Sequence, residues 1–384
     1  MTPAMLAWIT YLLLVPLYVF KSGLPQPGDL FIMIMVPAVL WRWNGRLPRA
    51  AREALQPLLW FTGWVFVVNY SWAMILGKFG LFGPDTFVLY PLYYLYNALV
   101  FLAALVLFRR HGEAFLRVTL YVTYGIVGAL VLSSFVTRGD GLRGSLFFNN
   151  PNQLGYYALL SACIIELLHR RLKQRRLTSG LALCACGYLS LISASRAAAI
   201  GISLLLIFMI FSNPRTLVVA SIAAIALLAG GGPISNAIDA SQQRVLAAQQ
   251  NPVGFLEERG YDRLLAHKEY LLLGAGEGGF SRFNESSRVK NMEIHSSAGT
   301  VLFSYGVVGA ILFLAFLGRV VWGAAARDAL VLLPALIYTV AHQGLRFTML
   351  WVLLAVFLMV KDHGAQRVRL RRRRWFASSG GARA

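Results

Sequence analysis

A histidine stands at the head of a long uncharged stretch in the last third of the chain. His295 follows Glu293, and no charged residue occurs between it and Arg319. An ionisable residue at the edge of a hydrophobic span is a candidate functional residue, because placing it there costs free energy that packing does not require. The alternative is a purely interfacial ring at the level of the lipid headgroups, and position alone leaves both interpretations open.

Arginines supply the second kind of chemistry. Arg196 lies between two apolar stretches with almost no loop to solvate it, so its guanidinium needs carbonyls, lipid phosphate or an anionic ligand. Snorkelling to phospholipid headgroups is the alternative. Arginines that face the headgroup region suit a lipid-attached diphosphate, and a plain solvated surface is the other interpretation. The polar segment before His295 carries Arg244, Arg259, Arg263, Lys268, Arg282, Arg288 and Lys290.

Other chemistries lack their residue patterns. Residues 274–279 match G-x-G-x-x-G, but without the strand and βαβ unit of a dinucleotide site, so we expect a flexible turn whose N–H groups can approach a ligand. No D-x-D or H-x-x-x-H occurs and the acidic residues form no ligand-like cluster, so we predict no metal site and no cofactor. Ser296 beside His295 makes no hydrolase pair, because neighbouring helical residues point apart. Any chemistry here has to use a histidine and arginines.

The composition defines the setting of these residues. With 58% hydrophobic residues, 14% charged residues and a mean hydropathy of +0.62, the chain is too apolar for a soluble domain. Cys163, Cys184 and Cys186 all fall inside apolar stretches, so they are neither a disulfide framework nor a metal site. The first apolar run, 5–20, has no basic start and no cleavage site, which favours a retained span over a signal peptide.

We therefore predict an all-α, polytopic integral membrane protein with about twelve transmembrane helices and one long exterior loop. Residues 1–231 would hold nine helices, 232–293 the loop with short helices, 294–360 three more helices, and 361–384 a basic cytoplasmic tail. The predicted spans are 4–20, 28–41, 57–77, 86–108, 118–136, 153–168, 179–193, 197–212, 216–231, 294–317, 329–342 and 346–360. Within the loop, 237–250 and 263–273 have helical composition, and the second suits a helix lying on the membrane or covering a cavity.

The distribution of basic residues predicts the orientation. Lysines and arginines number fifteen in alternate connections and eight in the tail, against six in the intervening short turns. Both termini are then cytoplasmic and the long loop is exterior. The formal net charge of +20 does not indicate nucleic-acid binding, because no aromatic–basic stacking platform accompanies the run 371–374.

The residues from His295 onward resemble the signature H-[NSQ]-x9-G-x-x-G of the O-antigen ligases. Ser296 follows the histidine, nine residues intervene, and Gly306 and Gly309 complete the spacing. A G-x-G-x-G-x-F-like turn at 274–280, an NNPNQ segment at 149–153 and the pair Ser195-Arg196 agree with that signature. Together they resemble the bacterial O-antigen ligase and polymerase superfamily of GT-C-type membrane glycosyltransferases over about 150–310. The first five spans match only as generic spans.

The resemblance implies transfer of a glycan from undecaprenyl diphosphate to a sugar hydroxyl, which belongs to lipid A–core for a ligase. The site would be on the periplasmic side of the bacterial inner membrane, with the long loop periplasmic, and the reaction metal-independent and inverting. By this resemblance His295 is the general base, since histidines titrate near neutral pH. Arg196 and one of Arg259 and Arg263 would hold the diphosphate in place of a metal. The spacing does not choose between the last two.

The resemblance also gives weaker substrate-binding candidates, Asn152 and Arg346. On a continuous helix Gly306 would lie roughly 16 Å from His295, too deep to touch a sugar. We therefore expect Gly306 and Gly309 to admit a neighbouring helix. An O-antigen or exopolysaccharide polymerase, with the same fold and lipid-linked donor, is the main alternative. A polysaccharide flippase or transporter is more remote, because it would tend to show internal repeats and charges at the membrane midplane.

Overall fold

The computed structural model of the 384-residue chain describes residues 1–21, 24–41, 43–80, 86–136, 144–212, 238–239, 242–243, 246, 254–283 and 293–361. Within them every regular element is a helix, which confirms the predicted all-α class. The predicted span 216–231, most of the predicted loop helix 237–250, and the tail after Lys361 lie outside the described residues. Arg244, Arg288 and Lys290 lie outside them too.

Eleven described segments correspond in order to predicted spans. They are α1 (Pro3–Leu14), α2 (Pro27–Trp41), α3 (Arg49–Leu76), α4 (Leu89–His111), α5 (Glu113–Val136), α6 (Pro151–Leu172), α7 (Arg176–Ile192), α8 (Arg196–Ser212), α13 (Ser297–Val321), α14 (Ala326–Ala341) and the helix Thr348–Lys361. By length and composition, four of them can cross a membrane: α3, α4, α5 and α13. The full count of twelve spans stays a prediction.

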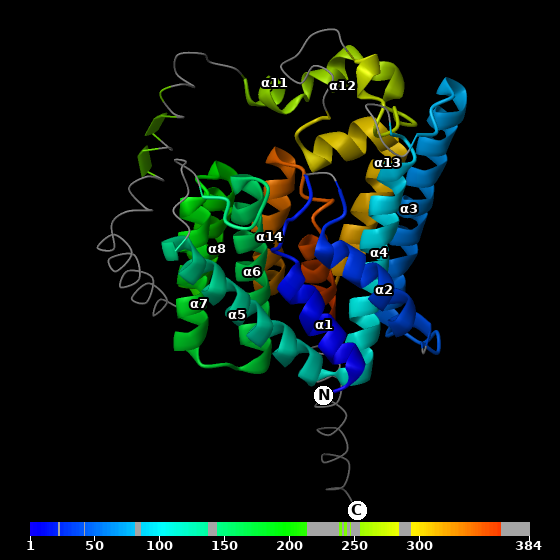
Figure 1. The fold of residues 1–384 in the computed structure, drawn as a ribbon. Helices are drawn as coiled ribbons and strands as arrows, with labels where there is room; N and C mark the ends of the chain where they lie inside the picture. The colour runs from blue at the N-terminus through cyan, green and yellow to red at the C-terminus, as the bar shows by residue number, and fades with distance from the viewer. Residues whose placement is uncertain are drawn as a thin grey trace, which may run out of the picture.

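Two helices form the centre of the bundle. In α6 every residue from Leu154 to Leu168 is buried, and in the helix Thr348–Lys361 every residue from Met349 to Met359 is buried. A helix that is buried on all sides belongs in the interior, and the other helices surround these two (Figure 1). The described part of the predicted long loop forms α11 (Phe255–Arg259), α12 (Asp262–Ala266) and the short 3-10 turns η1 (Lys268–Tyr270) and η2 (Phe280–Arg282). Figure 1 shows α11 and α12 across the end of the bundle opposite to the N terminus.

The first helix is shorter than predicted. α1 ends at Leu14 instead of continuing to Phe20, because Pro16 has no N–H to extend the helical hydrogen bonds. The chain that follows is an ordered loop, in which the Gln26 side-chain oxygen accepts hydrogen bonds from the N–H groups of Val19 and Phe20, both at 3.0 Å. The Tyr18 N–H donates to the Phe147 carbonyl at 2.9 Å, so this loop is attached to the segment before α6.

The helix α13 is broken in its middle. Gly306 has φ 68° and ψ −174°, outside the helical region. The predicted close approach of a helix at Gly306 is therefore wrong: a Cβ there would lie 2.3 Å from the backbone carbonyl oxygen of Leu272. The loop residues 271–276 pack into the break, where the Ala275 N–H donates to Phe303 O and the Val307 N–H to Leu271 O. At Gly309 a Cβ would lie 3.2 Å from the Trp64 side chain of α3, so this glycine does face a neighbouring helix.

The segment predicted as a flexible glycine turn is a buried structural element. Residues 274–279 are all buried, and Gly274, Gly276 and Gly278 have positive φ. A Cβ at Gly274 would lie 2.3 Å from Ser304 O, so only glycine fits this close approach to α13. The turn therefore lies inside the protein, where its backbone packs against α13.

Candidate functional site

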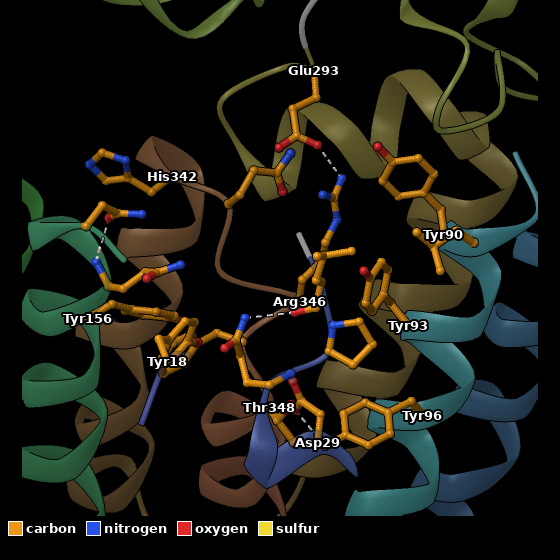
Figure 2. A pocket seen from close by; sticks show the side chains of 18 of the residues that line it. Tyr18, Asp29, Tyr90, Tyr93, Tyr96, Tyr156, Glu293, His342, Arg346 and Thr348 are labelled. Atoms are coloured by element: carbon orange, nitrogen blue, oxygen red, sulfur yellow. Dashed lines mark hydrogen bonds and ion pairs between the residues drawn. The ribbon is translucent and has the colours of Figure 1, made fainter. Parts of the chain in front are cut away.

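A cavity of about 600 Å³ opens at the end of the bundle where α11 and α12 lie. Its walls come from segments far apart in the chain, among them the loop before α2, α2 itself, the first turns of α4 and α6, residues 293–295 and residues 342–348. Three of the candidate residues line it, His295, Asn152 and Arg346. Figure 2 shows the side chains of this cavity.

His295 is held in one orientation by its neighbours. It lies before α13, not on it, because Ser296 is the N-cap and accepts a hydrogen bond from the Gly299 N–H at 3.1 Å. The backbone N–H of His295 donates to the Arg259 carbonyl at 3.0 Å, and its Nδ1 lies 2.8 Å from the Glu293 carbonyl. A carbonyl only accepts, so Nδ1 carries the proton and Nε2 is left as the basic nitrogen.

The opposite wall is tied directly to this histidine segment. The Ser297 hydroxyl accepts hydrogen bonds from the N–H groups of Gly344 and Leu345 at 2.7 and 3.0 Å, and donates to the His342 carbonyl at 3.2 Å. The Gln343 amide donates to the Ile294 carbonyl at 2.6 Å. These bonds join residues 294–297 to 342–345, so His295 and Arg346 keep a fixed relation.

Arg346 is clamped at the cavity. Its Nη2 forms ion pairs with Glu277 and Glu293, and its guanidinium lies 4.5 Å from the centre of the Tyr90 ring. Figure 2 shows Glu293 and Tyr90 beside Arg346. Burial alone would lower the pKa of Arg346, but the carboxylates of Glu277 and Glu293 raise it above the ordinary value. Arg346 therefore stays charged at any physiological pH.

Glu277 connects Arg346 to the rest of the fold. This residue is 0% exposed, and its Oε2 accepts hydrogen bonds from the Tyr94 and Tyr305 hydroxyls at 3.1 and 2.5 Å. The side-chain amide of Asn69 binds both its backbone N–H and its carbonyl, at 3.0 and 2.9 Å. The buried glycine turn thus places against Arg346 a carboxylate whose hydrogen bonds to Tyr94 and Tyr305 also fix it in the fold.

The two loop arginines that the motif left open lie in different surroundings. Arg259 reaches the cavity wall, where its Nη1 lies 3.4 Å from Nδ1 of His342. Arg263 is buried over the rings of Phe283 and Phe303, 5.1 and 5.9 Å from their centres, and does not line the cavity. Burial lowers the pKa of Arg263. Neither arginine lines the cavity, but Arg259 contacts the lining residue His342, whereas Arg263 packs on Phe283 and Phe303.

Arg196 stands apart from these groups. It is the first residue of α8, it is exposed, and it does not line the cavity. The turn before it packs on the start of α6, where a Cβ at Gly155 would lie 2.6 Å from the Ser193 hydroxyl. Arg196 therefore lies at the same end of the bundle as the cavity but does not line it. Asn152, at the start of α6, does line the cavity.

Sequence reasoning did not find the tyrosine-rich wall. Tyr18, Tyr90, Tyr93 and Tyr96 line the cavity with Asp29, whose two oxygens accept from the Tyr96 hydroxyl and the Gln26 N–H, both at 2.8 Å. Tyr156, Tyr338 and His342 add a column of stacked rings, with ring centres 4.0 and 4.9 Å apart. The run LYPLYYLY at the head of α4 was a signal, because tyrosine places a polar hydroxyl on an apolar span.

The mouth of the cavity has a different chemistry from its interior. The most exposed of its lining side chains are Leu24, Met33 and Leu92, at 40%, 48% and 40%. All three are apolar: Leu24 lies in the loop before α2, Met33 in α2 and Leu92 in α4. The polar and charged lining residues are all more deeply set. The cavity thus combines an apolar opening with a polar, aromatic interior.

Among the described residues, no group of three histidines, cysteines or acidic side chains could hold a metal ion. The chain matches no protein-family model, and no curated protein matches it. The resemblance to the ligase and polymerase superfamily therefore stays a prediction, which the geometry of the cavity has to support independently.

Proposed function

We propose that this protein is a membrane glycosyltransferase of the O-antigen ligase type, which moves a glycan from undecaprenyl diphosphate to a sugar hydroxyl of lipid A–core. The observation that carries the proposal is one cavity that holds both His295, with a basic Nε2, and Arg346, with Arg259 at its wall. A base and a cation in one cavity are what glycosyl transfer from a diphosphate needs.

In the proposed reaction the acceptor hydroxyl oxygen attacks the anomeric carbon of the donor glycan. The bond from that carbon to the diphosphate oxygen breaks, and the diphosphate leaves with the bonding electrons. Nε2 of His295 takes the hydroxyl proton, and Arg259 and Arg346 stabilise the departing negative charge. Direct displacement inverts the configuration at the anomeric carbon.

Two further features support a glycolipid substrate. Tyrosine rings and hydroxyls, with Asp29, Asn152 and Gln153, offer the stacking faces and hydrogen-bond partners that a sugar ring uses. The aliphatic mouth formed by Leu24, Met33 and Leu92 suits a substrate whose lipid chain stays in the bilayer while its head enters the cavity.

The proposed location is the inner membrane, with the cavity on the periplasmic side and both termini cytoplasmic. Support comes from the predicted basic connections, which meet at the end of the bundle away from the cavity. There the Arg109 side chain donates to the Arg46 carbonyl, Lys361 donates to carbonyls at the end of α13, and His111 lies 3.4 Å from the Thr2 hydroxyl. A basic end of this kind is typical of the cytoplasmic side.

The direct test is reconstitution of the purified chain with a lipid-linked donor and with lipid A–core. We expect glycan transfer that survives EDTA, because arginines take the place of a metal in the proposed mechanism. Loss of transfer on chelation, restored by Mg²⁺ or Mn²⁺, would contradict the metal-free proposal. Absence of transfer with every acceptor would contradict the enzyme assignment and favour a transporter.

A gene deletion separates a ligase from a polymerase. Loss of a ligase leaves lipopolysaccharide without O-antigen, while long polymer accumulates on undecaprenyl diphosphate. Loss of a polymerase leaves single repeat units that are still transferred to the core. We expect the first result; a one-repeat product would reassign the acceptor and keep the histidine and arginine roles.

A further inference from the structure

Two carboxylates hold the same arginine at the cavity, but they are not equivalent. Glu277 is 0% exposed and accepts two tyrosine hydroxyls besides its ion pair with Arg346. The Glu293 side chain is 28% exposed and lines the cavity, where it reaches Arg346 from the segment before His295 (Figure 2). One partner is therefore built into the fold, and the other can exchange with a ligand.

Arg346 has more hydrogen-bonding capacity than these carboxylates use. A guanidinium carries five N–H donors, and both ion pairs are formed by Nη2 alone. Its Nε is buried and has no hydrogen-bond partner within the described part of the chain. The guanidinium therefore has donors beyond Nη2 that a multivalent anion could use.

The charge balance immediately around Arg346 favours exchange when an anion binds there. Glu277 and Glu293 together carry one more negative charge than Arg346 neutralises, and Asp29 lines the same cavity. A diphosphate that approached Arg346 with both carboxylates in place would be repelled by them. Displacing the exposed carboxylate removes the repulsion and frees donors in one step.

We propose that Glu293 is an internal anion which occupies Arg346 until the substrate's diphosphate replaces it, and that Glu277 is the positioning residue that keeps the guanidinium aimed into the cavity. This inference rests on the proposed function and deepens it, because it assigns the diphosphate a subsite. On binding, phosphate oxygens take the place of the Glu293 carboxylate on Arg346. Glu277 stays bonded to Tyr94, Tyr305 and Arg346.

The same exchange connects donor binding to the base. The backbone carbonyl of Glu293 accepts the Nδ1–H of His295 at 2.8 Å, so one residue holds the arginine with its side chain and the histidine with its backbone. When the diphosphate displaces the Glu293 side chain from Arg346, the change occurs two residues before His295. Donor binding thereby acts on the segment that sets the direction of Nε2.

The test measures ligand binding and does not depend on catalysis. The purified full chain is titrated calorimetrically with farnesyl diphosphate and, separately, with farnesol, for the wild type, Glu293→Gln and Glu277→Gln. We expect Glu293→Gln to bind farnesyl diphosphate about tenfold more tightly, because a competing charge is lost. We expect Glu277→Gln to bind it at least about tenfold more weakly, because the arginine loses its fixed counter-charge. The affinity for farnesol, which has no diphosphate, should be the same for the wild type and both variants.

Glu269→Gln is the matched control. Its side chain is 60% exposed in the same loop, pairs with His267 and does not line the cavity, so binding should stay unchanged. The proposal is overturned if Glu293→Gln binds farnesyl diphosphate no more tightly than the wild type does, or if Glu269→Gln has the same effect. Where Glu277→Gln does not fold, the Glu293 and Glu269 variants decide alone.

The transfer assay is read separately from these titrations. Tighter diphosphate binding by Glu293→Gln without glycan transfer by any variant would leave the subsite standing and remove the proposed function. Glycan transfer by the wild type without tighter binding by Glu293→Gln would leave the function standing and remove the subsite.

Discussion

The two ends of the bundle both gather arginines, but they treat the charge in opposite ways. At the basic end, Arg49 pairs with Glu53 at 2.6 Å, with side chains 87% and 38% exposed. At the cavity end, Arg346 is 23% exposed and its partner Glu277 is 0% exposed. Solvent screens the first pair, so it contributes little to stability, whereas the second is a desolvated pair that is costly to break on one side only.

The comparison shows why residue type alone does not identify a site. Basic side chains at the basic end bind the ends of helices, as Lys361 does by donating to the carbonyls of Arg319, Val320 and Trp322 at the end of α13. Arg346 lines a cavity together with residues from segments far apart in the chain. Substitutions that look alike should therefore differ strongly between the ends.

The largest difference is expected for histidine. His295→Ala removes the proposed base, so the rate of transfer should fall by about 10²- to 10⁴-fold. His111→Ala at the basic end should leave the rate unchanged, since this ring contacts only the Thr2 hydroxyl among the described hydrogen-bond partners. Rates are measured with reconstituted protein, and membrane abundance is checked by immunoblot. More than about a tenth of the wild-type rate in His295→Ala would exclude a general base.

Two glycines of α13 extend the comparison to stability. Gly306→Ala places a Cβ on a residue with positive φ and only 2.3 Å from Leu272 O. This substitution should destabilise the protein by at least about 2 kcal/mol. Gly318, nearer the basic end of the same helix, has nothing within 4 Å of a built Cβ, and Gly318→Ala should stabilise by about 0.5 kcal/mol. Thermal unfolding in detergent measures both. Equal effects would mean that the break at Gly306 has no structural importance.

Much of the fold was predictable because a membrane helix is encoded locally. An apolar run long enough to cross a bilayer is visible in the sequence, and eleven described helices coincide with predicted spans. The early end of α1 was visible as well, since Pro16 stands inside the predicted span. The break at Gly306 was not, because an apolar run with an internal glycine reads as a continuous helix. Only the Leu272 carbonyl against it shows the difference.

The candidate site, like the fold, could be predicted from the sequence only in part. His295, Asn152 and Arg346 were candidates from the sequence, and the structure brings them to one cavity. Glu277 and Glu293 were missed, because acidic residues sixteen positions apart give no sign that both contact one arginine from another segment. Arg263 was a candidate by spacing, and its burial over Phe283 and Phe303 depends on tertiary packing that no local pattern encodes.

A smaller effect is expected when arginine is replaced by lysine. Arg346→Lys keeps the charge but loses the planar fork, so the KM for the diphosphate donor should rise by about tenfold. Arg319→Lys at the basic end should change neither KM nor kcat, because its contact with Glu53 is 3.8 Å long and exposed. Initial rates at varied donor concentration give both constants. An unchanged KM in Arg346→Lys would show that Arg346 binds no diphosphate.

The smallest effect is expected for the exposed pair itself. Arg49 precedes Glu53 by four residues, an order less favourable on a helix than the reverse, and both side chains are exposed. Arg49→Gln should therefore shift the thermal midpoint by no more than about 1 °C, and about 0.5 M salt should abolish the shift. The midpoint is measured in detergent at low and high ionic strength. A shift of more than about 4 °C that persists in salt would mean that the basic end also depends on desolvated charge, and the contrast with Arg346 would be lost.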